Sequence, residues 1–201
     1  MSKGLIITLS ILGGLLLVVI LTIGWGVGVY NKIVSADEGV KSAWSQVENQ
    51  YQRRYDLIPN LVETVKGYAK QEKDVLIGVT EARASVGQMK VTPEVLHDPQ
   101  AFQRFQQAQD GLGSALSRLM VVVEKYPDLK SNQNFLELQS QLEGTENRIS
   151  VERRRFNETV QQFNVMIRRF PASMIAGFSG FREAQYFKSI AGSENPPQVK
   201  F

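Results

Sequence analysis

The chain opens with one unbroken apolar block. Residues 5–29 contain only three hydroxyl side chains among apolar ones, and no charged residue lies between Gly4 and Asn31. A helix of that length measures about 37 Å, more than the roughly 30 Å of a bilayer's hydrocarbon core. The block therefore predicts a tilted single-pass transmembrane helix, preceded by a short tail, residues 1–4. Trp25 and Tyr30 lie near its far end and are candidate interfacial anchors.

A cleaved secretory signal is the alternative interpretation of this block. Lys3 supplies a minimal positive region, and Ala36 ends a stretch of small residues that a peptidase could cut. The apolar run is longer than the usual signal core of about 7–15 residues, and Ala36 lies well past its end. These features favour a retained anchor.

Small residues recur along the apolar block at a spacing of four: Ser10 with Gly14, and Gly24 with Gly28. Such spacing lets two membrane helices approach closely, so these four residues are candidates for helix packing. Glycine is common in membrane helices, and background glycine on a monomeric anchor explains the pattern equally well.

Beyond Tyr30 the apolar residues recur in steps of three and four, which is typical of helices. The pattern predicts an all-α chain: the transmembrane helix continues into an elongated antiparallel bundle of about four helices, residues 30–190. The expected elements are long helices at about 30–86, 99–126 and 132–170, a short C-terminal helix at about 172–190, and a mobile tail, residues 191–201.

Local signals refine these boundaries. Pro59 predicts a kink or a break within the first long helix, because it removes a backbone donor and crowds the preceding turn. Asp98 before Pro99 predicts the start of the second helix, and Ser131 is the expected cap of the third.

Glu152 is the one carboxylate on the apolar seam of the third long helix. An unpaired charge inside a bundle costs several kcal/mol, so Glu152 requires a cationic partner or a solvated edge. Arg53 and Arg54 are the candidate partners, which predicts a buried ion pair.

The C-terminal stretch is rich in apolar residues that something must cover. They could dock on the chain's own bundle, contact another subunit or lie on the membrane surface. The candidate contact residues are Met174, Ile175, Phe178, Phe181, Tyr186 and Phe187.

Composition narrows the chemistry. The chain has no cysteine and one histidine, His97, which argues against thiol chemistry, disulfides and multi-histidine metal sites. Its net charge of +3 is small and not clustered, which argues against nucleic-acid binding. Paired carboxylates such as Glu143 and Glu146 are explained by a solvated helical face. We expect no enzyme activity and no cofactor.

Two blocks of sequence resemble the bacterial LemA family. The first runs from Ala43-Trp44-Ser45-Gln46-Val47 to Arg53-Arg54-Tyr55-Asp56-Leu57-Ile58-Pro59-Asn60-Leu61-Val62, and the second from Tyr126-Pro127-Asp128-Leu129-Lys130 through Phe135-Leu136-Glu137-Leu138-Gln139 and Glu146-Asn147-Arg148-Ile149 to Arg153-Arg154-Arg155-Phe156-Asn157. The resemblance implies a single pass through the bacterial cytoplasmic (inner) membrane and a helical domain on the extracytoplasmic, periplasmic side. It implies no catalytic residues.

These observations favour a non-enzymatic envelope scaffold that self-associates in the bilayer as a homo-oligomer. The alternative is an accessory binding module that recruits a partner membrane protein, a protease or a signalling system. An enzyme with an unrecognised carboxylate site is a third, weaker hypothesis.

Overall fold

A computed structural model describes residues 3–89 and 92–188. Every regular element in these ranges is helical, which confirms the all-α prediction. The elements are α1 (Lys3–Tyr68), α2 (Lys73–Gly87), the 3₁₀ helix η1 (Pro93–His97), α3 (Pro99–Val123), α4 (Pro127–Lys130), α5 (Gln133–Arg168) and α6 (Ala172–Ser179).

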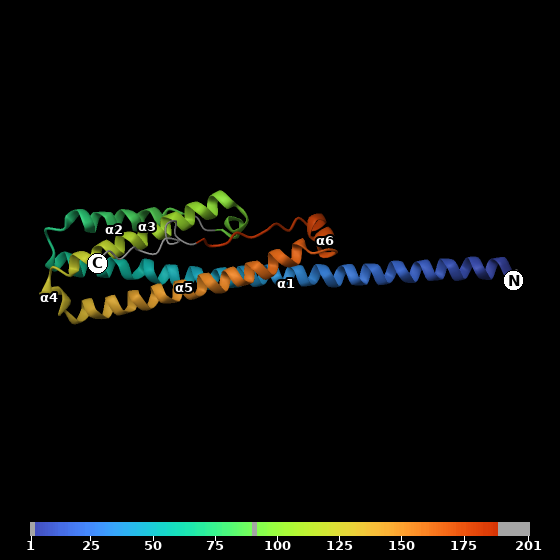
Figure 1. The fold of residues 1–201 in the computed structure, drawn as a ribbon, viewed down its shortest axis with the longest axis horizontal. Helices are drawn as coiled ribbons and strands as arrows, with labels where there is room; N and C mark the ends of the chain where they lie inside the picture. The colour runs from blue at the N-terminus through green and yellow to red at the C-terminus, as the bar shows by residue number, and fades with distance from the viewer. Residues whose placement is uncertain (1–2, 90–91, 189–201) are drawn as a thin grey trace, which may run out of the picture.

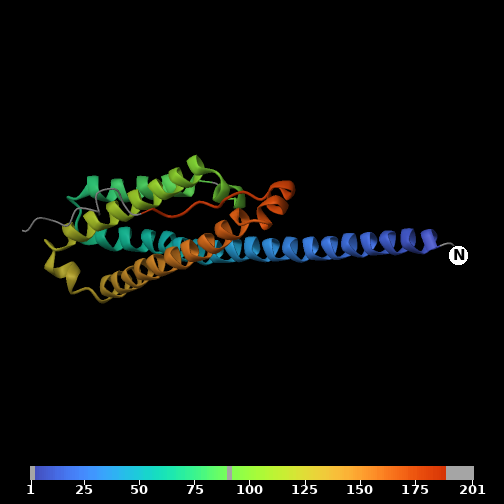
Figure 2. The ribbon, with the colours of Figure 1, turned by 45° about the vertical axis from the view of Figure 1, so that its right-hand side comes forward.

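Helix α1 is a single rod of 66 residues, or about 100 Å at 1.5 Å per residue. Its first part stands clear of the other helices, and its second part belongs to the bundle (Figures 1 and 2). Within the described residues, α1 alone is long and apolar enough to cross a membrane, and its most apolar window is unburied by the protein. The candidate membrane-spanning segment and the bundle therefore share one continuous helix.

Helix α1 continues through Pro59, so the break considered there is absent. A proline at this position leaves the carbonyl of Tyr55 without its helical donor. Arg83 of α2 fills the gap: its Nε donates to the Tyr55 carbonyl at 3.2 Å, and its guanidinium stacks 3.8 Å from the Tyr55 ring centroid. The kink at Pro59 stays a prediction, and the first long helix instead ends at Tyr68, where residues 69–72 turn the chain into α2.

The helices form two antiparallel pairs, α1 with α5 and α2 with α3 (Figure 1). Asp98 caps α3 as expected, because its carboxylate accepts from the backbone of Gln100 and Ala101 at 2.8 and 3.1 Å. Helix α5 is capped by Asn132 and not by Ser131: the Asn132 side chain accepts from the Phe135 N–H at 3.0 Å.

The C-terminal helix is shorter than predicted. It ends at Ser179 because Gly180 adopts φ +78°, a left-handed conformation that suits glycine and terminates helices. Residues 181–188 then run back between α3 and α5 without helical structure (Figures 1 and 2). We call this segment the strap. The expected helix at 189–190 and the tail 191–201 lie outside the described residues.

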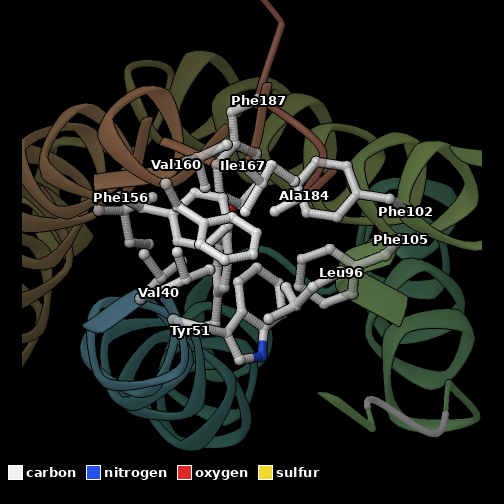
Figure 3. Packing of buried hydrophobic residues seen from close by; sticks show 14 of the residues in the cluster. Val40, Tyr51, Leu96, Phe102, Phe105, Phe156, Val160, Ile167, Ala184 and Phe187 are labelled. Carbon is white, nitrogen blue, oxygen red and sulfur yellow. The ribbon is translucent and has the colours of Figure 1, made fainter. Parts of the chain in front are cut away.

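The buried residues divide into two clusters along the bundle. The proximal core lies toward the apolar half of α1 and combines large aromatic rings with Ile33, Val40, Val160 and Ile167 (Figure 3). The distal core, at the far end, consists mainly of leucine and valine, with Phe135 as its buried phenylalanine. Between them lies a layer of buried polar side chains, which we call the polar layer.

Candidate functional site

The polar layer centres on Arg54 of α1, whose side chain is almost completely buried, with the residue 2% exposed. Its Nη1 donates to Glu146 of α5 at 2.9 Å. Its Nη2 donates to the backbone carbonyl of Gln109 on α3 at 3.2 Å and to the Gln109 side-chain oxygen. One guanidinium thus joins three helices. Removing a partner would leave a buried charge or acceptor unsatisfied, so the layer fixes the axial register of α1, α3 and α5.

The predicted pair of Glu152 with Arg53 or Arg54 is therefore wrong. Arg54 binds Glu146 instead, and Glu152 pairs with Arg155 one turn along α5 at 2.9 Å. Arg53 is exposed on the outer face of α1. Glu152 escapes the cost of full burial because it lies at the partly solvated edge of the seam.

A second cationic group lies beside the layer. Arg153 of α5 donates to the Tyr51 hydroxyl and to the Asp110 carboxylate, the latter at 3.0 Å. Its guanidinium lies 4.8 Å from the centroid of the Phe187 ring in the strap. Burial raises the pKa of Tyr51 to about 12, although the charge of Arg153 opposes the shift. Tyr51 therefore stays protonated at neutral pH and cannot act as a base there.

The strap is held by side-chain amides. Asn164 of α5 donates to the carbonyl of Ala184 and accepts from its N–H, both at 2.9 Å, and Asn157 makes the same pair of bonds with Phe187, again at 2.9 Å. From α3, Gln106 binds the backbone of Lys188 at 2.7 and 3.2 Å. Each side-chain amide presents an N–H donor and a carbonyl acceptor to the strap backbone, as the backbone of a neighbouring strand would.

Sequence reasoning missed these amides. The available signal was the seven-residue spacing of Asn157 and Asn164, two turns apart on one face of α5. Asn164 directly follows the seam residue Phe163 and is fully buried. A buried asparagine needs hydrogen-bond partners, so this position indicated a backbone segment lying against the helix.

A groove of about 790 Å³ lies between α3 and α5 beside the polar layer. Arg54 and Glu146 line its inner part, and Phe187 and Lys188 of the strap line one side. Charged groups of both signs face it, with Asp110 and Glu158 opposing Arg153 and Arg154. The mixed charge suits a polar protein surface better than a polyanion. Its lining residues are Arg54, Gln109, Asp110, Gly113, Ser114, Ser117, Glu146, Ile149, Ser150, Arg153, Arg154, Asn157, Glu158, Gln161, Tyr186, Phe187 and Lys188.

The remaining candidate residues lie in two places. Ser10, Gly14, Gly24 and Gly28 are exposed on the apolar part of α1. A Cβ built at Gly14, Gly24 or Gly28 meets no neighbouring group within 4 Å. Trp25 is exposed there as well. The group's role in helix packing stays a prediction.

The C-terminal contact candidates divide into covered and uncovered side chains. Phe187 is buried in the proximal core, and Ile175 and Phe181 pack against it, so these three serve the chain's own fold. Met174, Phe178 and Tyr186 remain exposed. Phe181 lies 6.1 Å, centroid to centroid, from the predicted anchor Tyr30.

His97 ends η1, where its Nδ1 lies 3.3 Å from the carbonyl of Glu183. Within residues 3–89 and 92–188 no three His, Asp or Glu side chains gather as a metal site would require. Two ion pairs beside the groove join helices: Arg54 with Glu146, and Arg153 with Asp110. These four groups stabilise the packing of the bundle.

The fold and the polar layer define a membrane-associated helical-bundle protein. Its first helix, α1, carries an apolar segment and continues into the bundle. The chain belongs to the LemA family, which it matches over residues 43–201.

Named relatives agree with this assignment. The chain is 29% identical to the magnetosome protein MamQ of Magnetospirillum gryphiswaldense, covering 85% of this chain and 70% of that one. It is 28% identical to the magnetosome protein MamQ 2 of Paramagnetospirillum magneticum, covering 83% and 67%. It is 24% identical to the protein LemA of Metamycoplasma hominis, covering 78% and 69%. These names denote no enzyme activity.

Proposed function

We propose that this protein is a non-enzymatic scaffold that self-associates in the bacterial inner membrane, with its bundle on the periplasmic side. The observation that carries the proposal is the continuity of α1, which joins the apolar segment to the bundle without a hinge. A rigid rod transmits any orientation fixed in the bilayer to the whole domain. Copies that pack through the membrane segment would therefore also align their bundles.

The outer face of α1 offers the packing surface for this association. Gly24 and Gly28 lie on the side opposite to Ile33, the first fully buried residue of the proximal core, whereas Gly26 and Val29 lie on the bundle side and are partly covered. A second α1 could approach this face closely at Gly24 and Gly28, because a Cβ built at either position meets nothing within 4 Å. The relatives named as magnetosome proteins are compatible with a role in an organised membrane structure.

Disulfide cross-linking tests the proposal cleanly because the chain has no cysteine. Gly28→Cys and Gly24→Cys should give covalent dimers in native membranes after mild oxidation. Gly26→Cys is the matched control, since the same substitution lies on the bundle side. Equal dimer yields at all three positions, together with a monomeric particle in mild detergent, would exclude the scaffold.

A binding module is the second candidate, and the groove between α3 and α5 favours it. Such a module would recruit a partner membrane protein, a protease or a signalling protein through the charged rim. Reversing an exposed rim charge with Arg154→Glu should then abolish capture of a partner from solubilised membranes. Arg148→Glu, which changes an exposed arginine of the same helix that does not line the groove, should leave capture intact. A scaffold would instead recover chiefly itself with both variants.

A further inference from the structure

Helix α6 has two faces with different surroundings. Its inner face, Ala172, Ile175 and Ala176, packs against the proximal core. Its outer face exposes Met174 and Phe178, which are 56% and 91% exposed. Phe170, in the turn between α5 and α6, is 80% exposed. Three large apolar side chains, two on α6 and one in the turn before it, thus remain without cover from the bundle.

These side chains lie where the apolar segment of α1 ends. Phe181, just after α6, packs against Tyr30, and Val29 belongs to the same cluster as Ala172 and Ile175. Figures 1 and 2 show α6 at the end of the bundle from which α1 continues alone. The exposed face of α6 is therefore at the depth where the predicted membrane span meets water.

We propose that α6 is an interfacial helix that inserts Met174 and Phe178, together with Phe170 of the preceding turn, into the bilayer that α1 crosses. The eight residues of α6 carry no charge, so nothing on the helix itself opposes insertion. Interfacial helices bury their apolar face roughly 5–10 Å into the boundary between headgroups and acyl chains. Lipid is the occupant because α6 lies beside Val29 and Tyr30, at the end of the candidate membrane span whose apolar surface the protein leaves uncovered.

Charged groups of both signs surround α6. Arg169 precedes the helix, Arg182 follows it, and Lys32 lies near Tyr30 on α1; all three are exposed. These cationic groups can reach phosphate headgroups while the rings lie deeper. Acidic groups lie nearby as well: Glu183 is 3.9 Å from the Arg168 guanidinium, and Asp37, Glu38, Glu94 and Asp98 line a pocket with residues 179–182. Lys41 pairs with Asp37 and Glu38 and offsets part of this negative charge.

A second point of attachment changes how the domain stands in the membrane. Because α1 is continuous with the bundle, the two tilt in the bilayer as one body. Insertion of α6, which lies on the bundle side of α1, would limit this tilt and leave Gly24 and Gly28 on the face opposite to the anchored side. The proposal rests on the membrane placement of residues 5–29 and is independent of self-association.

Depth-dependent fluorescence quenching tests the proposal on the full-length protein in vesicles of phosphatidylcholine and phosphatidylglycerol. A fluorophore on Phe178→Cys should lose most of its emission to lipids that carry a quencher just below the headgroup. The same label on Val121→Cys, 67% exposed and at the distal end of α3, should keep its emission. Unquenched emission at Phe178→Cys overturns the proposal.

Two further measurements separate the ways in which it could fail. A label on Leu16→Cys, within the apolar segment, should be quenched by lipids that carry the quencher near the bilayer centre. Quenching at Leu16→Cys without quenching at Phe178→Cys rejects the insertion of α6 but keeps the membrane placement of residues 5–29. Loss of quenching at both positions rejects the membrane placement itself. In a separate sample without label, oxidation of Phe178→Cys tests for disulfide dimers. Such dimers, together with a label in the first sample that lipid does not quench, would assign this face to a second copy and overturn the proposal as well.

Discussion

The proximal and distal halves of the bundle close their cores in different ways. In the distal half α4 and the turn into α5 bring the helices together, and leucine and valine fill the interior. In the proximal half α3 diverges from α1, and the strap enters between α3 and α5 (Figures 1 and 2). Aliphatic side chains bridge helices about 8–10 Å apart, so a wider space needs larger groups.

Aromatic rings supply those groups in the proximal half. Trp44 lies 5.2–6.0 Å, centroid to centroid, from four phenylalanines that come from α3, α5 and the strap. The members drawn in Figure 3 meet around a common centre. The comparison shows that the proximal half depends on a segment far along the chain, whereas the distal half is closed by consecutive helices.

The largest expected effect comes from removing the central ring. Trp44→Ala should lower the free energy of unfolding by about 3–5 kcal/mol, because it leaves a large cavity among packed rings. Leu61→Ala in the distal core should cost roughly 2–5 kcal/mol, in the lower part of that range if the leucine-rich core closes partly around the smaller cavity. Urea unfolding followed by far-ultraviolet circular dichroism measures both. A smaller loss at Trp44 than at Leu61 would contradict the central place given to the aromatic cluster.

Releasing the strap should have the next largest effect. Asn164→Leu leaves the buried N–H and carbonyl of Ala184 without partners, for a loss of about 2–4 kcal/mol. Amide hydrogen exchange should accelerate across the strap while the distal core stays protected. Asn147→Leu changes an exposed asparagine of the same helix and should leave both measurements close to wild type. Equal exchange in the two variants would show that the amide pairs do not hold the strap.

The polar layer between the halves should contribute less. Arg54→Met keeps much of the buried volume but removes the donors to Glu146 and Gln109, so we expect a loss of about 1–3 kcal/mol. Glu146 is partly exposed and can regain water, which limits the cost. Arg53→Met, at the neighbouring exposed position, should change stability by less than about 0.5 kcal/mol. Similar melting temperatures for the two variants would contradict a structural role for the polar layer.

The smallest effect is a loss of stability at high pH. The pKa of Tyr51 is about 12 in the folded protein and about 10 as the unperturbed value, so folding favours its protonated form. Its contribution is complete below pH 10 and declines as the pH rises toward 12, by about 1 kcal/mol between pH 10 and 11. Tyr51→Phe should remove this part of the decline. An unchanged pH slope in that variant would contradict the assignment.

The helices could be predicted from the sequence because their signals are local. Steps of three and four located α3 and α5 to within a few residues, and the carboxylate of Asp98 caps its helix as expected. At Pro59 local chemistry predicts a kink or a break. The helix is unbroken there, and Arg83 from another helix satisfies the orphan carbonyl. Such compensation depends on tertiary contacts.

The partner of Arg54 could not be predicted because a helical seam does not fix axial register. Sliding α5 by about one heptad along α1 matches apolar residues equally well, and Glu146 and Glu152 are separated by nearly that distance. The strap was missed because an eight-residue segment held by side-chain amides has no periodicity of its own. Its signal lay on α5, in the spacing of Asn157 and Asn164.

The pairing of α1 with α5 has a consequence for biosynthesis. Arg54 and Glu146 are 92 residues apart in sequence, and Tyr51 and Arg153 are 102 apart. A ribosome therefore releases the apolar segment and the core-facing side of α1 long before α5 exists. Insertion into the bilayer can precede folding, and until α5 emerges a chaperone or the membrane surface would shield the exposed apolar side chains of α1.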